Sequence, residues 1–187
     1  SVGKMYTALA IQKEMVSRGI KATFRATGQT GIFIAGEGIS VDAVIADFIS
    51  GATEWLSPSN DDDHWDIIEG QGSLYHASYA GVTMGLIHGA QPDALVLCHE
   101  PTRSHMRGLP GHPVPDLKDC IKANLDAARL TNPKVECIGV SINTNDLAKE
   151  DREDYLARIE DELKLPTVDP VLTGVGRVVD NLPELSR

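Results

Sequence analysis

The chain has 187 residues, of which 42% are hydrophobic, and a formal net charge of −10. That length is enough to bury the core of one sizeable domain. The acidic charge argues against nucleic acid as a partner, because binding to a phosphate backbone requires a basic surface. The sequence has no run of about 18 consecutive apolar residues, so it predicts no transmembrane helix and no membrane partner.

The sequence begins with Gly3 and Lys4, followed directly by a helical pattern over residues 4–18 that ends at Gly19. Gly-Lys before a helix is typical of the second half of a phosphate-binding loop, where backbone N–H groups and a lysine hold phosphate. An exposed helix start with a solvated lysine is the alternative. Met5 stands where the motif has a Ser or Thr for Mg²⁺, which favours phosphate binding over phosphoryl transfer. Because no strand or glycine turn precedes Gly3, we expect this chain to be cut from a longer protein.

Strands and helices are expected to alternate beyond this first helix. The predicted strands are 21–27, 65–69, 94–98, 135–142 and a short one at Val168, and the predicted helices are 42–56, 79–88, 117–130, 149–163 and 171–181. The glycine-dense segment 28–38 and the proline-rich segment 100–115 are expected to be loops. The alternation is typical of βαβ units, so residues 1–187 are predicted to form one three-layer αβα domain with a mostly parallel sheet.

The three cysteines, Cys98, Cys120 and Cys137, show no Cys-x-x-Cys spacing. Cys98 and Cys137 lie in apolar, strand-like runs, which favours reduced core residues over a disulfide or zinc framework. We therefore expect a cytoplasmic protein without a bound metal.

Polar and glycine-rich residues follow the predicted strands, and ligands bind beyond the carboxyl ends of parallel strands. Gly28 and Gly70 lack a side chain, so a ligand can approach the backbone closely. Asn143 ends the strand at 135–142, where its amide either reads a nucleobase edge or caps the following turn. The predicted cofactor-binding residues are therefore Gly3, Lys4, Met5, Gly28, Gly70 and Asn143.

Three ionisable residues at the same strand ends are the predicted catalytic group: Glu69, His99 and Arg103. Glu69 follows two isoleucines and precedes glycines, which favours a site residue over a solvated strand end. His99 is equally well explained as a buried core histidine. Arg103, in a proline-rich loop, is a candidate for binding an anion.

The blocks at 3–7, 24–31, 66–73 and 98–103 resemble the DgcN-type D-amino-acid N-acetyltransferase family, formerly a domain of unknown function. The blocks at 2–4, 68–72 and 139–143 resemble, more distantly, dethiobiotin-synthetase-type P-loop proteins. These resemblances imply a P-loop NTPase-like fold and a longer parent protein with a Rossmann-like domain ahead of this one. They also imply acetyl transfer from acetyl-CoA to the amine of D-glutamate or a related D-amino acid, upstream of a dehydrogenase- or epimerase-like enzyme.

For acetyl transfer, an amine must lose a proton and an oxyanion must be stabilised. Our hypothesis makes Glu69 or His99 the base, pairs Arg103 with the substrate carboxylate, and places Lys4 on a phosphate of CoA. An ATP-dependent ligase or kinase, using ATP with Mg²⁺ on a carboxylate substrate, remains an alternative. A non-catalytic nucleotide-binding regulator is another. The expected partners are a small amino acid, further copies of the chain in a homo-oligomer, and the N-terminal domain.

Overall fold

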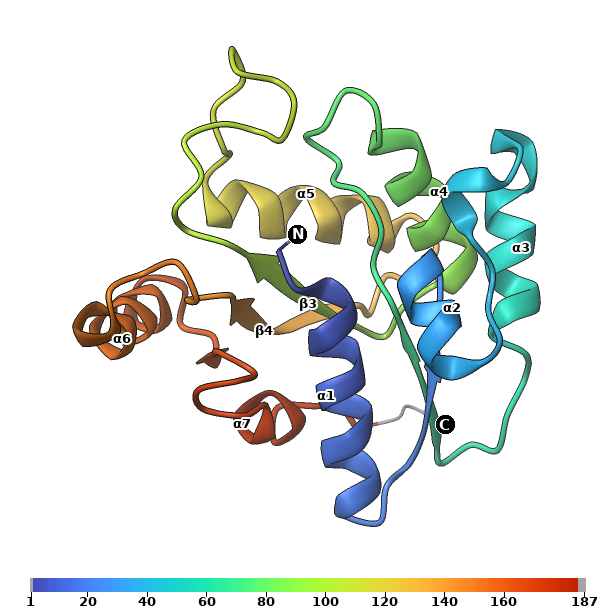
Figure 1. Ribbon diagram of the computed structural model, residues 1–187. Helices are drawn as coiled ribbons and strands as arrows, with labels where there is room; N and C mark the ends of the chain where they lie inside the picture. The colour runs from blue at the N-terminus through green and yellow to red at the C-terminus, as the bar shows by residue number, and fades with distance from the viewer. Residues whose placement is uncertain (1, 185–187) are drawn as a thin grey trace.

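A computed structural model describes residues 2–184 of the chain, and the structural statements below refer to these residues. Helices and strands alternate, as Figure 1 shows. The strands are β1 (Lys21–Arg25), β2 (His64–Ile68), β3 (Ala94–His99), β4 (Glu136–Ile142) and β5 (Thr167–Val168). The α-helices are α1 (Lys4–Ser17), α2 (Gln29–Ala35), α3 (Ile49–Leu56), α4 (Ala80–Ala90), α5 (Leu117–Arg129), α6 (Arg152–Leu163) and α7 (Gly176–Val179). Short 3₁₀ turns are η1 (Val41–Ala43), η2 (Ala46–Phe48) and η3 (Lys149–Asp151).

All strand pairs are parallel, and within residues 2–184 they form two sheets rather than one. The first sheet has the order β1-β2 and the second the order β3-β4-β5. A β-bulge shifts the register of β3 against β4 at Leu95 and Val96. The last five residues of β4 are buried, as expected for a central parallel strand, whereas every residue of β2 and β3 is only half-buried.

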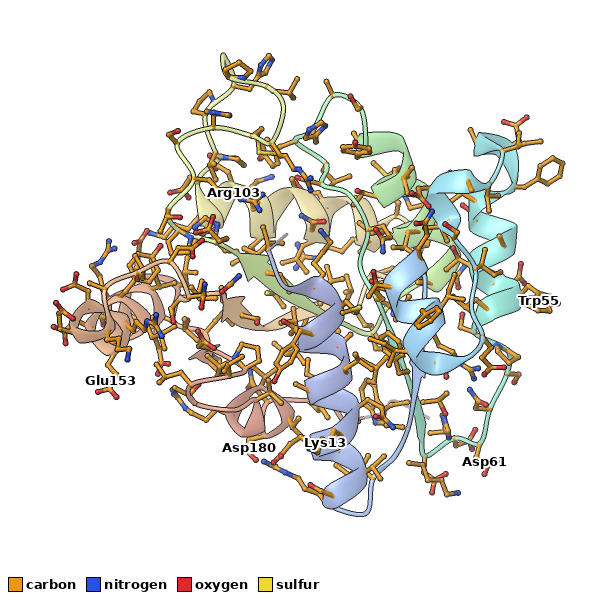
Figure 2. The ribbon with its side chains drawn as sticks, viewed as in Figure 1. Lys13, Trp55, Asp61, Arg103, Glu153 and Asp180 are labelled. Atoms are coloured by element: carbon orange, nitrogen blue, oxygen red, sulfur yellow. The ribbon has the colours of Figure 1, made fainter. Side chains whose placement is uncertain are left out.

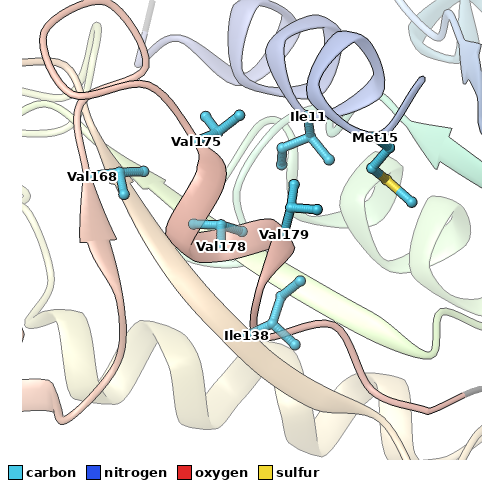
Figure 3. Close-up of a cluster of buried hydrophobic side chains, with 7 residues drawn as sticks. All are labelled: Ile11, Met15, Ile138, Val168, Val175, Val178 and Val179. Atoms are coloured by element: carbon cyan, nitrogen blue, oxygen red, sulfur yellow. The ribbon is translucent and has the colours of Figure 1, made fainter. Parts of the chain in front are cut away.

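Helices cover both faces of the strands, which confirms the predicted three-layer α/β arrangement. On one face, α1 packs against α7 and the strands through the cluster in Figure 3, which contains Ile11 and Met15 of α1 together with Val175, Val178 and Val179. On the other face, Ile87 of α4 packs with Ala127 and Ala128 of α5. Burying each large apolar side chain contributes about 1.5–3 kcal/mol, so these two clusters hold the layers together.

Helices α3 and α4 approach each other closely at glycines of α4. A Cβ on Gly89 would lie 2.3 Å from the backbone oxygen of Ser50, and one on Gly85 would lie 2.7 Å from Ile49. The absence of side chains at these two positions therefore sets the distance between the helices. No helix among the described residues is long and apolar enough to cross a membrane.

Two predicted elements were wrong in ways that have a physical cause. The segment predicted as a glycine loop contains α2, and the N–H groups of the two residues before this helix, Thr27 and Gly28, donate to a distant carboxylate described below. The predicted helix over 42–56 is broken into η1, η2 and α3. Its start is held in another conformation because the N–H groups of Ile39 and Val41 donate to the carbonyls of Ala26 and Thr27. Ile45 and Phe48, which an amphipathic helix over this segment would bury, are exposed.

The predicted final helix over 171–181 is also shorter than expected. Asp169 accepts hydrogen bonds from the N–H groups of Val171 and Leu172, and this turn delays the helix until Gly176.

Candidate functional site at the carboxyl ends of the strands

A cavity of about 730 Å³ lies beyond the carboxyl ends of β2 and β3. Its walls come from the start of α1, the loops that follow β2 and β3, and the inner side of α5. Figure 2 shows Arg103 at this edge of the molecule, whereas Asp61 and Asp180 lie at the opposite edge. The lining residues that carry charge or chemistry are Lys4, Gly70, His76, His99, Glu100, Arg103 and Cys120.

Lys4 reaches across the end of β2 toward the loop beyond it. Its Nζ donates to the carbonyl of Gly72 at 3.3 Å. A Cβ on Gly70 would lie 3.2 Å from Cδ of Lys4, so Gly70 leaves the space that the lysine stem occupies. Gly3, just before α1, has φ +93°, a conformation that favours glycine. Burial lowers the pKa of Lys4, while the charges of Cys98 and Glu69 oppose this change.

Glu69 holds the turn that leads into α2. Its Oε2 accepts hydrogen bonds from the N–H groups of Thr27 and Gly28, both at 3.1 Å, and the residue is 5% exposed. A Cβ on Gly31 would lie only 2.3 Å from the same oxygen, so the contact requires a glycine there. Neither Glu69 nor Gly28 lines the cavity, and both are structural contacts in this arrangement.

Glu100, which is buried, and Arg103, which is partly exposed, form an ion pair in the cavity wall. The Oε1 of Glu100 accepts from N and Oγ1 of Thr102 at 2.7 and 2.6 Å, and its Oε2 accepts from Nε of Arg103 at 3.1 Å. Burial alone would raise the pKa of Glu100, but the hydrogen bonds from Thr102 and the charge of Arg103 outweigh it, and the pKa is lowered. Within residues 2–184, Nη1 and Nη2 of Arg103 have no hydrogen-bond acceptor. These two groups are therefore the donors that remain for an anionic ligand.

His99 precedes this ion pair at the end of β3. Burial lowers the pKa of His99. The charge of Glu100 partly opposes this change, and the charge of Arg103 adds to it, but both effects are smaller than that of burial. A histidine with a lowered pKa is neutral at pH 7 and is able to accept a proton.

Two predicted cofactor-binding side chains do not face the cavity. Met5 packs on the cluster that contains Phe24 and Ala26, which leaves only its backbone for a ligand at the start of α1. The Oδ1 of Asn143 accepts from the N–H of Asn145 at 3.1 Å, and so caps the turn after β4. This contact matches the second of the two roles that the sequence allows for Asn143.

His76 is a buried residue that lines the cavity, and the sequence was equally consistent with a pocket-lining and a packing role for it. The N–H of Ser78 donates to its Nδ1 at 3.1 Å, so its Nε2 carries the proton and donates to the carbonyl of Arg107 at 2.9 Å. His76 thereby joins the loop after β2 to the loop after β3. No local pattern points to this contact, because the two residues are 31 positions apart.

Residues 1–179 match the family described as "Domain of unknown function (DUF1611_C) P-loop domain". The chain belongs to the DUF1611 family. A crystal structure of a DUF1611 family protein from Anabaena variabilis superposes with a TM-score of 0.91 at 34% sequence identity. That superposition covers 97% of this chain and 54% of the crystallised one, and it agrees with the predicted P-loop fold.

Two curated relatives of this DUF1611 chain are named D-glutamate N-acetyltransferase. The protein from Tritonibacter scottomollicae is 59% identical and that from a Pseudoalteromonas species 52% identical, each over 97% of this chain. The chain spans about half the length of these relatives, since the matches cover 55% of each.

Proposed function

We propose that this chain is the phosphate-binding part of an N-acetyltransferase that transfers acetyl from acetyl-CoA to the amine of D-glutamate or a related D-amino acid. The observation that carries the proposal is the 52–59% identity to two proteins named D-glutamate N-acetyltransferase over nearly the whole chain. The cavity supports it, because Arg103 presents unpaired donors for a carboxylate beside a histidine of lowered pKa. The Rossmann-like N-terminal domain remains part of this proposal.

In the proposed reaction the substrate carboxylate pairs with Nη1 and Nη2 of Arg103, whose orientation is fixed by Glu100. His99, neutral at pH 7, accepts a proton from the substrate amine. The amine nitrogen attacks the thioester carbonyl; a C–N bond forms, the C–S bond breaks, and the thiolate of CoA leaves and takes up a proton. Glu69, which the sequence offered as an alternative base, acts in this scheme by positioning the loop before α2.

Lys4 is the residue proposed to hold a phosphate of CoA. Its ammonium lies at the start of α1, where the first N–H groups of a helix have no acceptor inside the helix and attract anions. Gly70 keeps the space around the lysine stem open. Because Met5 supplies no hydroxyl for Mg²⁺, this arrangement favours binding of a phosphorylated cofactor over its hydrolysis.

The cysteines near the cavity favour direct transfer over an acetyl-enzyme intermediate. Burial raises the pKa of Cys98 and of Cys137, and burial together with the charges of Asp116 and Asp119 raises that of Cys120 to about 11. The nucleophile in thioester exchange is the thiolate, which these residues do not form at neutral pH. We therefore expect no acetyl-cysteine in protein quenched during turnover.

The test is an assay of the full-length protein with acetyl-CoA and D-glutamate, in which release of free CoA is followed. Turnover with D-glutamate, its loss in His99→Ala and its retention in Glu69→Gln variants that stay folded would support these roles. Equal turnover by both variants would remove both residues as bases. Magnesium-dependent release of ADP from ATP, without acetyl transfer, would instead favour the ligase or kinase alternative.

We also propose that the protein is a cytoplasmic homo-oligomer. Large apolar side chains are exposed on α2, η2 and α3, among them Phe33, Phe48 and Trp55, and Figure 2 shows Trp55 projecting away from α3. We infer that these side chains belong to an interface, because large exposed apolar surfaces often mark sites of protein–protein contact. Sedimentation of the full-length protein and of its Trp55→Glu variant tests the proposal, which a monomeric wild-type protein would contradict.

A further inference from the structure

Arg107 lies at the tip of a tight turn in the loop after β3, which projects above α5 in Figure 1. The N–H of Leu109 donates to the carbonyl of Met106 at 2.9 Å, and Gly108 has φ +75°, which suits a glycine at the third position of a turn. The N–H of Met106 donates to the carbonyl of His112 at 2.8 Å and closes the base of the turn. The backbone on both sides of Arg107 is therefore held in place.

The loop after β2 also holds the backbone of Arg107. The buried His76 donates from Nε2 to the carbonyl of Arg107 at 2.9 Å. This contact uses only the main chain of Arg107, so it fixes the position of the residue and leaves its guanidinium available. Arg107 lines the cavity of about 730 Å³ together with Arg103, which lies four positions earlier in the same loop.

The guanidinium of Arg107 has no partner in the part of the chain that the structure describes. The residue is exposed, and neither a hydrogen bond nor an ion pair joins its side chain to another of residues 2–184. Arg103 differs, because Glu100 accepts a hydrogen bond from its Nε. An arginine whose donors are all available is suited to bind a carboxylate through two parallel hydrogen bonds.

The charged side chains of the cavity are mostly cations, although the protein is acidic. Three cations and two carboxylates line the cavity, namely Lys4, Arg103, Arg107, Asp42 and Glu100. The whole chain, in contrast, has a formal net charge of −10. The cavity is therefore a positive surface in an acidic protein, and such a surface attracts anions.

We propose that Arg107 binds the side-chain carboxylate of the substrate and thereby selects an acidic amino acid. This inference rests on the proposed function, in which Arg103 binds the α-carboxylate and His99 accepts the proton of the amine. The α-carboxylate, the amine and the side-chain carboxylate then each have a separate partner in the cavity. An amino acid with a neutral side chain leaves Arg107 without a partner and binds less tightly.

Binding of D-glutamate and of D-glutamine to the full-length protein tests this proposal without acetyl transfer. The two amino acids have nearly the same shape, but only D-glutamate carries a charge on its side chain. Calorimetric titration is done with free CoA present, because free CoA has no acetyl group to transfer. The wild-type protein should bind D-glutamate more tightly than D-glutamine.

Arg107→Gln should weaken the binding of D-glutamate roughly 10-fold or more, because a charge-assisted contact is lost. The same variant should change the binding of D-glutamine less than about twofold. Arg107→Lys should keep part of the preference for D-glutamate, because it keeps the charge but not the two parallel donors. Neither substitution touches the contact between His76 and the main chain of Arg107, so both variants should fold.

Arg129→Gln is the matched control. Arg129, the last residue of α5, is also exposed and without a hydrogen bond or ion pair in the described part of the chain, and it lies outside the cavity. This substitution removes the same charge from the protein. It should leave the affinities for both amino acids within about twofold of the wild-type values.

Wild-type affinity for D-glutamate in Arg107→Gln, or equal weakening for D-glutamate and D-glutamine, would overturn the proposal. Weaker binding of CoA with unchanged binding of D-glutamate would assign Arg107 to a phosphate of the cofactor, and would also overturn it. The same holds if the wild-type protein does not bind D-glutamate. If the expected affinities are found but acetyl-CoA yields no acetyl transfer, the role of Arg107 stands and the proposed function fails.

Discussion

Glu100 is the carboxylate that orients Arg103, so the Glu100→Gln variant tests the candidate site directly. Glutamine keeps one acceptor oxygen for the two Thr102 donors at 2.7 and 2.6 Å. It replaces the charged acceptor 3.1 Å from Nε of Arg103 by a neutral group. A hydrogen bond to a charged group contributes about 1.5–3 kcal/mol. Because the side chain of Arg103 is 29% exposed, solvent screens the pair and we expect a loss of about 1–2 kcal/mol.

In the full-length protein this loss should lower kcat/KM for D-glutamate roughly 5- to 30-fold, with the KM for acetyl-CoA unchanged. Glu160→Gln is the matched control. Glu160 likewise accepts a backbone N–H, from Thr167, and pairs with Arg177, but it lies outside the cavity. The control should change kcat/KM less than about twofold. Equal losses in the two variants, or wild-type kinetics in Glu100→Gln, would refute the role given to Glu100.

Three further predictions concern pH and stability. Activity should rise with pH through an apparent pKa below 6.5, because burial lowers the pKa of His99; a midpoint above 7 would contradict this. At Gly51 of α3 an added Cβ meets nothing within 4 Å, so Gly51→Ala should raise the melting temperature by up to ~4 °C. Gly89→Ala should lower the melting temperature, because the added Cβ forces α3 and α4 apart. Equal shifts in the two variants would show that the close approach of the helices is unimportant for stability. Asp169→Asn should cost about 2–4 kcal/mol in urea unfolding at pH 7, since Asp169 accepts from Thr144 and from two further backbone N–H groups. Burial alone would raise the pKa of Asp169, but these hydrogen bonds lower it. The stabilisation is therefore present above about pH 4 and lost as the carboxylate protonates, so the variant and wild type should converge in acid.

The elements predicted well from sequence are those whose signal is local. Strand β3 forms at the apolar run 94–98, and α1 forms at the helical pattern after Gly3. In both segments the spacing of the apolar residues alone is enough to indicate the element. Helix α2 was missed because the turn that leads into it is held by Glu69, about forty residues further along the chain, which accepts from the N–H groups of Thr27 and Gly28. The helix over 42–56 was overpredicted because contacts with Ala26 and Thr27 override the local pattern.

The same distinction applies to the candidate site. Glu100 and Arg103 are three residues apart, so the sequence already placed a carboxylate and a guanidinium together. Gly28 and Glu69 also come together as neighbouring strand ends predict, but they bind each other rather than facing the cavity. Which way a side chain turns at a strand end depends on partners remote in sequence, and a pattern of residue types does not contain that information.

The hydrogen bond between His76 and Arg107 has a consequence for the two loops that it joins. Both loops border the cavity that takes the amino acid in the proposed function, so a movement of one loop is transmitted to the other. A change that breaks this hydrogen bond would therefore alter the entry of the proposed substrate and the release of its product together.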